Sequence, residues 1–469
     1  MLLERWGLPL NEIEQLGDSL ADFWQYFSQW TRTQTRDTSH YGFCYLRGLI
    51  SLDSQRNYAN IGRQTDVPEQ NMHHLMSNTP WSGPLLISKI QEEIAQQEEF
   101  QESSVLLLDE SADEKAGPQS VGARRQHNGR RGKVDNCQVG VFLSLANNGY
   151  HTWVDGEVYI PADWFGDEAR QRRQQAGIPE ERLFHTKPEL GWQMIQRVWE
   201  QGLPFEAVAF DMLYGRNPWL RDQVGATGME YYADTPANTK VYLEPPIIGI
   251  PQNKRGPKAK KKRVLSPKAV RVDRLRHAPD TFWQTITLRP SERGYLKADF
   301  ARRRVWTVRD DWTVVEEWLL IRRDDKKHTY TFSNAPVDTP LLTMAQRKSQ
   351  RFFIERSIQD AKSELGWDEF QATKFRAWEH QLAMTILASW FITYTRLGWA
   401  HRFERDPELL AQYEVEILPA LSMANVRAML QAAMPLPQLS PEEAAYLVVK
   451  HLDNRTRSRK SRMRGGPSP

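Results

Sequence analysis

Residues 105–111 read VLLLDES, a run of four apolar residues that leads directly into two acids and a serine. A short apolar run bounded by charged residues is typical of a fully buried strand. A carboxylate at the end of such a strand has two explanations. Asp109 is either a loop residue at the point where the strand reaches solvent, or part of a metal site.

The segments that follow predict the order strand, hairpin, helix, strand. Residues 138–145 and 151–160 read as two strands around an Asn-Asn-Gly turn, which is a strong hairpin signal. The sequence TKPE at 186–189 has the spacing of a capping box and should open a helix. FEAVAFD at 205–211 is then a second buried strand, and it too ends in an acid.

Asp109 and Asp211 are therefore each predicted at the end of a buried strand. Ligands gather beyond the carboxyl ends of the strands in open sheets. Two aspartates at adjacent strand ends repel each other unless cations lie between them. Mg²⁺ prefers such carboxylate oxygens, and two ions about 3.5–4 Å apart can activate a nucleophile and stabilise a leaving 3′-oxygen in phosphodiester displacement. We expect the acids Glu110 and Asp113 to lie in a solvated loop.

A third carboxylate is offered by a helix predicted over residues 341–364. Arg351, Glu355 and Lys362 have the spacing i, i+4, i+11, which places them on one helix face beside an apolar stripe. This position suits the lining of a cleft, and it also suits a salt-bridged surface face. Glu364 is an alternative ligand, but it lies about 180° round the helix from Glu355, so both cannot serve one site.

The N-terminal hundred residues read as helical. Residues 56–77 predict two short helices around a turn that contains Pro68, an arrangement that fits either a DNA-reading helix-turn-helix or an ordinary helical hairpin. Two basic runs, 254–263 and 455–464, contain no acid. Such runs are either solvated, mobile segments or contacts to a polyanion.

Composition excludes several classes of protein. The chain has 469 residues and a net charge of +3, and its two cysteines form no CxxC pair, which argues against a structural zinc site. Its longest apolar run, 382–392, is too short to cross a bilayer. The N-terminus does not read as secretory. We therefore expect a cytoplasmic protein without a membrane partner.

Three regions of the chain resemble bacterial insertion-sequence DDE transposases of the DDE endonuclease superfamily. Residues 106–147 resemble the region of the first catalytic aspartate in that family, residues 182–224 that of the second, and residues 351–391 that of the third acid. The resemblance extends over roughly residues 20–400. Its most specific parts are GKVDNCQVGVF (132–142), TKPEL (186–190) and AKSELG (361–366).

The resemblance implies an α/β fold, with an RNase H-like (retroviral-integrase-like) catalytic core, an inserted β-rich subdomain and a helical N-terminal domain. It implies Asp109, Asp211 and Glu355 as the catalytic, metal-binding triad for two Mg²⁺ ions, which Mn²⁺ could replace. Arg351, Glu355 and Lys362 also fit the family's Tyr-Arg-Glu-Lys signature. Lys348 stands at the tyrosine position, where it could hold a phosphate as a point charge.

The same comparison gives a domain plan and candidate DNA contacts. The expected parts are a helical DNA-binding domain (1–100), the two parts of the core (101–247 and 340–400), a β-rich insertion (248–339) and a helical C-terminal region with a basic, disordered tail (401–469). The expected DNA-binding residues are Arg351, Lys362, Lys348, Arg130, Arg131 and Lys133. In the insertion, Trp306, Trp312 and Trp318 either stack on DNA or simply pack within the sheet.

These features predict a nucleoid-associated DDE transposase that acts on double-stranded DNA, at both terminal inverted repeats and target. Paired-end strand transfer in the family implies a homodimer on DNA. Two alternatives are an RNase H-like endonuclease without strand transfer, and a DNA-binding protein on an inactivated transposase scaffold.

Overall fold

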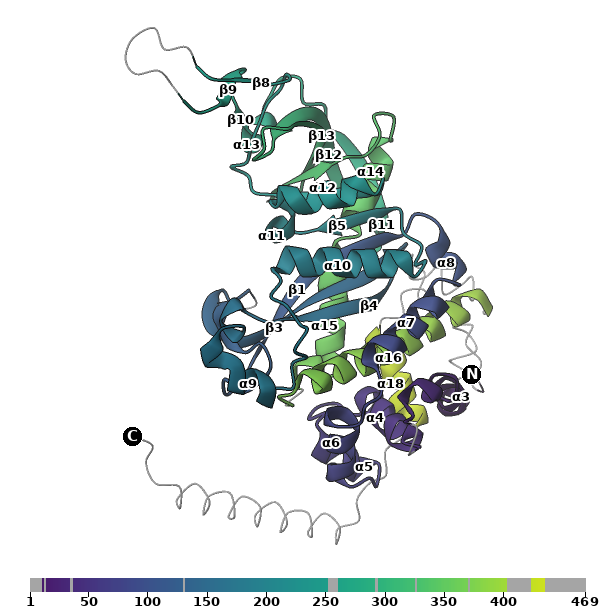
Figure 1. The fold of residues 1–469 in the computed structure, drawn as a ribbon. Helices are drawn as coiled ribbons and strands as arrows, with labels where there is room; N and C mark the ends of the chain where they lie inside the picture. The colour runs from purple at the N-terminus through teal and green to yellow at the C-terminus, as the bar shows by residue number, and fades with distance from the viewer. Residues whose placement is uncertain are drawn as a thin grey trace.

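The computed structural model describes residue 11 and residues 14–33, 37–129, 131–251, 260–291, 294–324, 327–369, 372–402 and 423–434. A ten-stranded sheet forms its centre, with the order β11-β12-β13-β14-β6-β5-β1-β3-β2 and with β4 paired to β3 (Figure 1). The strands are β1 (Val105–Glu114), β2 (Arg124–Asn128), β3 (Lys133–Asn147), β4 (Tyr150–Tyr159), β5 (Ala207–Phe210), β6 (Glu230–Thr235), β11 (Gln284–Ser291), β12 (Gly294–Val308), β13 (Val314–Arg323) and β14 (His328–Ser333). The predicted strands at 105–108, 138–145, 151–160 and 205–211 are thus confirmed.

Strand β1 joins two kinds of pairing. It runs antiparallel to β3 along its whole length and parallel to β5 from Val105 to Leu108. The expectation that the strand ends at Asp109 was wrong. Because the long strand β3 continues to pair with it, β1 extends to Glu114, and Asp113 lies in the strand and not in a loop.

The hairpin between β3 and β4 turns as the sequence predicted. Asn148 and Gly149 both have positive φ, 47° and 91°, which a two-residue turn of this kind requires and which asparagine and glycine adopt at the lowest cost. Their tight turn sets the register of β4 on β3. Aromatic side chains from both strands then stack, with the Phe142 and Trp153 rings 4.5 Å apart.

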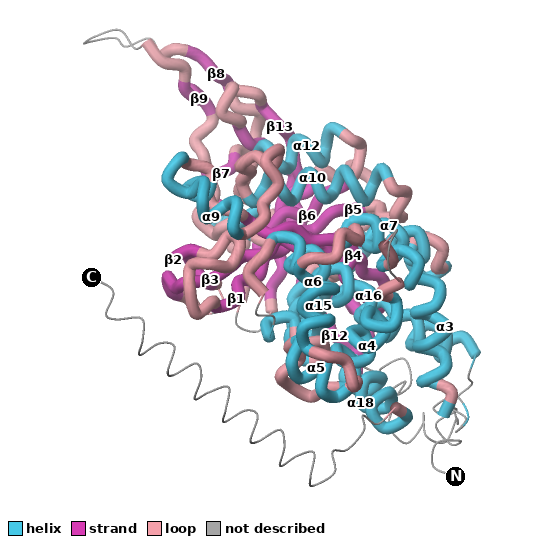
Figure 2. Tube along the Cα trace, turned by 60° about the horizontal axis from the view of Figure 1, so that its bottom comes forward, coloured by secondary structure: helices cyan, strands magenta, loops and turns pink. Residues whose placement is uncertain are grey.

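Helices cover both faces of the sheet (Figures 1 and 2). The helix that TKPE opens is α10 (Lys187–Glu200), and the predicted capping box between Thr186 and Glu189 is present. It packs on the face of Leu108, against which Gly191 approaches so closely that a Cβ would lie 2.7 Å from the leucine. The opposite face, to which Val105 and Leu107 contribute, packs against α14 and α15.

The helix predicted over 341–364 is two helices. These are α14 (Leu341–Ser349) and α15 (Phe352–Ser363), separated by Gln350 and Arg351. The apolar periodicity continues across the break, because Met344 and Ile354 both face the same core, and periodicity alone therefore could not reveal it. The next helix, α16 (Phe375–Arg402), matches the helix predicted over 372–398.

The N-terminal part of the structure is helical, as expected. Its helices are α3 (Leu16–Ser28), α4 (Ser39–Ser51), α5 (Tyr58–Gln64), α6 (Glu69–Ser77) and α7 (Gly83–Ile94). Together with α18 (Met423–Ala433) they surround α16 at one end of the molecule (Figure 1). Their buried apolar residues belong to the same hydrophobic core as Leu106 and Leu108 of β1. This helical layer therefore packs directly against the sheet.

The region expected to be β-rich contributes β11–β14, and these strands extend the central sheet. β14 pairs antiparallel with β6, from Tyr330↔Thr235 to Ser333↔Tyr232. A two-stranded arm of β8 (Ile247–Gly249) and β9 (Arg263–Ser266) lies at the far end of the molecule from the helical layer (Figure 1). Most of the basic run 254–263 and all of 455–464 fall outside the described residues.

Within the part of the chain that the structure describes, no helix is both long and apolar enough to cross a membrane. A cavity of about 50 Å³ lies between α7, β4, α10 and α16. It is lined by Asp155, Glu157, Arg197 and Glu379, and Arg197 binds both Asp155 and Glu157, at 2.7 and 3.1 Å. Burial, reinforced by the charge of Glu157, raises the pKa of Glu379 to about 7.

The raised pKa of Glu379 predicts that the protein loses stability as the pH rises. Between pH 4.5 and 7 the folded protein keeps a proton on Glu379 that the unfolded chain releases, so this residue costs stability increasingly as pH rises through that window and by a constant amount above it. We expect Glu379→Gln to match the native protein near pH 4.5 and to exceed it at pH 8, by on the order of 2 kcal/mol in the free energy of unfolding. Urea unfolding of both proteins across this pH range measures the difference.

Glu92→Gln, at an exposed carboxylate on α7, is the control and should change the free energy of unfolding by less than about 0.5 kcal/mol at either pH. A Glu379→Gln difference that is independent of pH would contradict the assignment.

Candidate active site

The two aspartates come together at the edge where parallel pairing stops. β1 and β5 are in register up to Leu108↔Phe210, and the next residue of each chain segment is Asp109 and Asp211. The carboxyl ends of two adjacent parallel strands therefore carry one acid each, as the sequence predicted. Their proximity has an electrostatic effect, because the charge of Asp211 helps to raise the pKa of Asp109.

Alternation along β1 decides which face each acid occupies. Side chains point to opposite faces at successive positions, so Asp109 shares the α15 face with Val105 and Leu107. Glu110 points to the other face, where Lys187 of α10 binds it at 2.7 Å. Asp113 returns to the α15 face and binds Lys362.

Asp211 also caps a short helix, α11 (Met212–Gly215). Its Oδ1 accepts hydrogen bonds from the backbone N–H groups of Leu213 at 2.8 Å and Tyr214 at 3.4 Å. These bonds fix the carboxylate at the strand end and leave its second oxygen available to a ligand. Gly215 closes the turn tightly, because a Cβ there would lie 2.0 Å from the backbone oxygen of Asp234.

Glu355 lies in the first turn of α15, and its side chain is 54% exposed. It is linked to the aspartates by Arg351, the residue before the helix. The Arg351 guanidinium contacts Glu355, lies 3.6 Å from Asp109 and lies 3.3 Å from Asp234. A cationic side chain thus lies among three carboxylates that belong to β1, β6 and α15.

Burial shapes the electrostatics of this group. It raises the pKa of Asp109 to about 7, with the charge of Asp211 acting in the same direction and Arg351 in the opposite one. Burial also raises the pKa of Asp211, against the two backbone hydrogen bonds that lower it. Both aspartates are therefore held where their charges are costly, and a bound cation would relieve that cost.

Asp234, at the end of β6, is a site residue that the sequence reasoning missed. The register Phe210↔Ala233 places it directly beside Asp211, on the next parallel strand. It accepts a hydrogen bond from Thr331 at 2.6 Å and pairs with Lys348 at 2.7 Å. The available signal was the same as for the other aspartates, an acid at the end of an apolar run, here EYYAD.

The residues predicted to contact DNA fall into two groups. Lys348 and Lys362 are both bound within the protein. Lys348 is buried and binds Asp234, and Lys362 is half-buried and binds Asp113 and the Ala112 carbonyl. Arg131, between β2 and β3, and Lys133, the first residue of β3, are both exposed and lie near Asp135. Arg130 lies outside the described residues.

The chemistry of the three acids fits a hard divalent ion, since carboxylate oxygens are its preferred ligands. Among the described residues, however, no group of three or more histidine, cysteine, aspartate or glutamate side chains is gathered closely enough to hold a metal. The guanidinium of Arg351 lies among the acids instead. A metal ion would have to displace Arg351 from Asp109 and Glu355, while Asp234 could retain it.

Of the three tryptophans considered for stacking, Trp312 is the most exposed, at 37%, and it has a φ of 74° in the turn after β12. Trp318 is buried between the guanidinium groups of Arg302 and Arg304, at 4.5 and 4.9 Å. It therefore packs within the sheet.

We predict that Asp234→Asn lowers the free energy of unfolding by about 3 kcal/mol, because it leaves the buried Lys348 without a charged partner. Lys348→Met in the same background should recover part of the loss, since it removes the uncompensated charge. Urea unfolding of the single and double variants measures both effects. A change below about 0.5 kcal/mol in Asp234→Asn, typical of a surface substitution, would show that the pair is not buried in solution.

Comparison with known proteins identifies the family of this chain. The family model described as DDE superfamily endonuclease matches residues 23–294, more than half of the chain and a span that includes Asp109 and Asp211. The chain is also 25% identical, over 353 residues, to the "Probable transposase for insertion sequence element IS701" of Microchaete diplosiphon, an alignment that covers 74% of this chain and 81% of that protein. The protein is an enzyme of the DDE superfamily endonuclease family.

Proposed function

We propose that this protein is a transposase that cleaves DNA at transposon ends and joins the freed 3′-OH to target DNA. The observation that carries the proposal is the placement of Asp109 and Asp211 at the ends of adjacent parallel strands, with Glu355 joined to Asp109 through Arg351. The similarity to a protein named as a probable transposase supports the same function.

The topology supports an RNase H-like core. Within the central sheet the order β4-β3-β1-β5-β6 combines three antiparallel strands with two parallel ones, and the acids lie where the two kinds of pairing meet. We infer that these five strands with α10 and α15 form the catalytic core, and that β11–β14 form an insertion into it. α15 then brings the third acid to the sheet.

Asp109, Asp211 and Glu355 would hold the divalent ions, Mg²⁺ or Mn²⁺. When bound, such ions activate a water or hydroxyl nucleophile and stabilise the leaving 3′-oxygen. Arg351, freed from Asp109 and Glu355 by that neutralisation, can donate to a DNA phosphate while Asp234 keeps it nearby. Lys362 binds Asp113 and the Ala112 carbonyl, and so fixes α15 against the strand that carries Asp109.

DNA contacts would come from several parts of the molecule. The exposed Arg131 and Lys133 can neutralise backbone phosphates, and Arg130 lies between the same two strands in the sequence. The helices α5 and α6 pack as a pair, and α6 exposes Gln70, His73 and His74, which suits the reading of terminal repeats. Action at two ends requires at least two copies, and we propose a homodimer on DNA within the cytoplasm.

We predict that Asp109→Asn and Glu355→Gln each reduce Mg²⁺-dependent cleavage of transposon-end DNA by about 100-fold or more, equivalent to about 3 kcal/mol of activation free energy. Each substitution removes one charged oxygen from the proposed ligand set and keeps the shape of the side chain. Single-turnover cleavage of a labelled duplex measures the rate. Glu92→Gln, an exposed carboxylate on α7, is the control and should cleave as the native protein does. Native rates in Asp109→Asn would refute the site.

Strand transfer requires a separate measurement. Pre-cleaved end DNA and a supercoiled target, incubated with the native protein and Mg²⁺ or Mn²⁺, should give joined products that Asp109→Asn fails to form. Hydrolysis without joining would favour the alternative function, an RNase H-like endonuclease that cuts only. DNA binding without either reaction would favour an inactivated transposase scaffold.

A further inference from the structure

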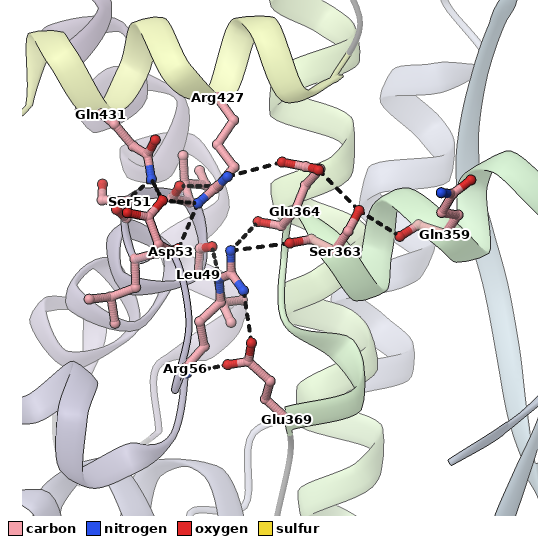
Figure 3. Close-up of polar contacts among 12 residues, drawn as sticks. Leu49, Ser51, Asp53, Arg56, Gln359, Ser363, Glu364, Glu369, Arg427 and Gln431 are labelled. Atoms are coloured by element: carbon pink, nitrogen blue, oxygen red, sulfur yellow. Dashed lines mark hydrogen bonds and ion pairs between the residues drawn. The ribbon is translucent and has the colours of Figure 1, made fainter.

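Arg56 is a buried arginine in the segment between α4 and α5, with only 1% of its surface exposed (Figure 3). Its guanidinium donates to the Leu49 carbonyl of α4 at 3.1 Å and to the Ser363 and Glu364 carbonyls at the end of α15, at 3.4 and 2.9 Å. It also binds the Glu369 carboxylate at 3.1 Å, and the Arg56 backbone N–H donates to the same carboxylate. One side chain therefore joins the helical layer to α15.

A second arginine, Arg427 of α18, binds the same region from the other side (Figure 3). It donates to the Ile50 and Leu52 carbonyls at 3.0 and 2.8 Å, to Asp53 at 2.9 Å and to the Glu364 carboxylate at 3.0 Å. Glu364, considered from the sequence as an alternative metal ligand, is thus engaged away from the acids. Its role here is to bind Arg427.

Both arginines lie at helix C-termini. The last carbonyls of α4 and α15 have no partners within their helices and carry the negative end of each helix dipole, so a cation there is favourable. Arginine serves several carbonyls at once with five donors spread over a planar group, whereas lysine has three donors on a single nitrogen. Gly366, with φ of 68°, lets the chain turn beside Arg56, where a Cβ would lie 2.5 Å from the arginine Cδ.

Helix α15 connects this arginine pair to the acids. Its twelve residues extend roughly 18 Å, with Arg351 and Glu355 at one end and the carbonyls bound by Arg56 at the other. Because a helix moves as a nearly rigid rod, a tilt at its C-terminus displaces Glu355. Arg56 is also close to the candidate DNA-reading pair, because it lies two residues before α5, the first helix of that pair.

We propose that Arg56 is a positioning residue that couples the α5–α6 pair to α15, so that DNA held by these helices fixes the position of Glu355. The inference rests on the proposed function in assigning Glu355 to the active site and α5–α6 to DNA. Arg56 itself is buried and is bound to Leu49, Ser363, Glu364 and Glu369 rather than to the three acids. The coupling acts through its bonds to the last carbonyls of α15 and to Glu369.

The test uses the full-length protein and duplex DNA that carries the transposon end. Arg56→Lys keeps the charge but loses the multiple bonds, and Glu369→Gln weakens the same contact while leaving the arginine on the carbonyls. We expect both variants to bind end DNA within twofold of the native affinity by fluorescence anisotropy. Their single-turnover cleavage rates should fall at least tenfold, and the double variant should lose no more than the more impaired single variant. Arg32→Lys, at an exposed arginine that pairs with Asp37 and lies outside the α5–α6 pair, should change cleavage by less than twofold.

Hydrogen exchange of the α15 amides gives a readout that does not require cleavage. DNA should slow exchange in residues 352–363 of the native protein, and should do so much less in Arg56→Lys and Glu369→Gln. Cleavage within twofold of native in both variants would overturn the proposal, as would equal losses of binding and cleavage. A native protein that cleaves no DNA would refute the proposed function instead. In that case hydrogen exchange alone tests the coupling. If DNA does not slow exchange of the α15 amides in the native protein, the proposed coupling is wrong.

Discussion

The structure depends on how buried negative charge is balanced at the point where parallel and antiparallel pairing meet in one sheet. β1 brings Asp109 to this point, β5 brings Asp211 and β6 brings Asp234. Three carboxylates on neighbouring strands repel one another where they are poorly solvated. Ion pairs with Arg351 and Lys348 compensate this negative charge. The short helix α11, the break between α14 and α15 and the tight turn at Gly215 all serve to place these groups.

Two residues that take part in this balance lie on either side of the break between α14 and α15. Lys348 binds Asp234 from the last turn of α14. Arg351, the residue before α15, contacts Asp109, Asp234 and Glu355. Lys348, predicted from the sequence as a phosphate contact, is therefore a partner of the aspartate on β6, and it is too buried to contact a phosphate as the molecule stands.

Local patterns in the sequence were sufficient for much of the fold. The Asn-Gly turn, the capping box at Thr186 and the apolar runs before Asp109 and Asp211 each have a physical cause that acts within a few residues. The features that the sequence could not reveal depend on distant partners. The extension of β1 beyond Asp109 requires β3, the pairing of Asp234 with Lys348 requires α14, and the arginine pair at α15 requires segments more than 300 residues apart.

The continuity of the sheet between β6 and β14 has a mechanical consequence. β6 carries Asp234, and β14 is hydrogen-bonded to it along four residue pairs, so β11–β14 continue the same sheet as the strands that carry the acids. Neighbouring strands of a sheet lie about 4.8 Å apart. The distance of each of these strands from Asp109 and Asp211 is therefore set by the number of strands between them.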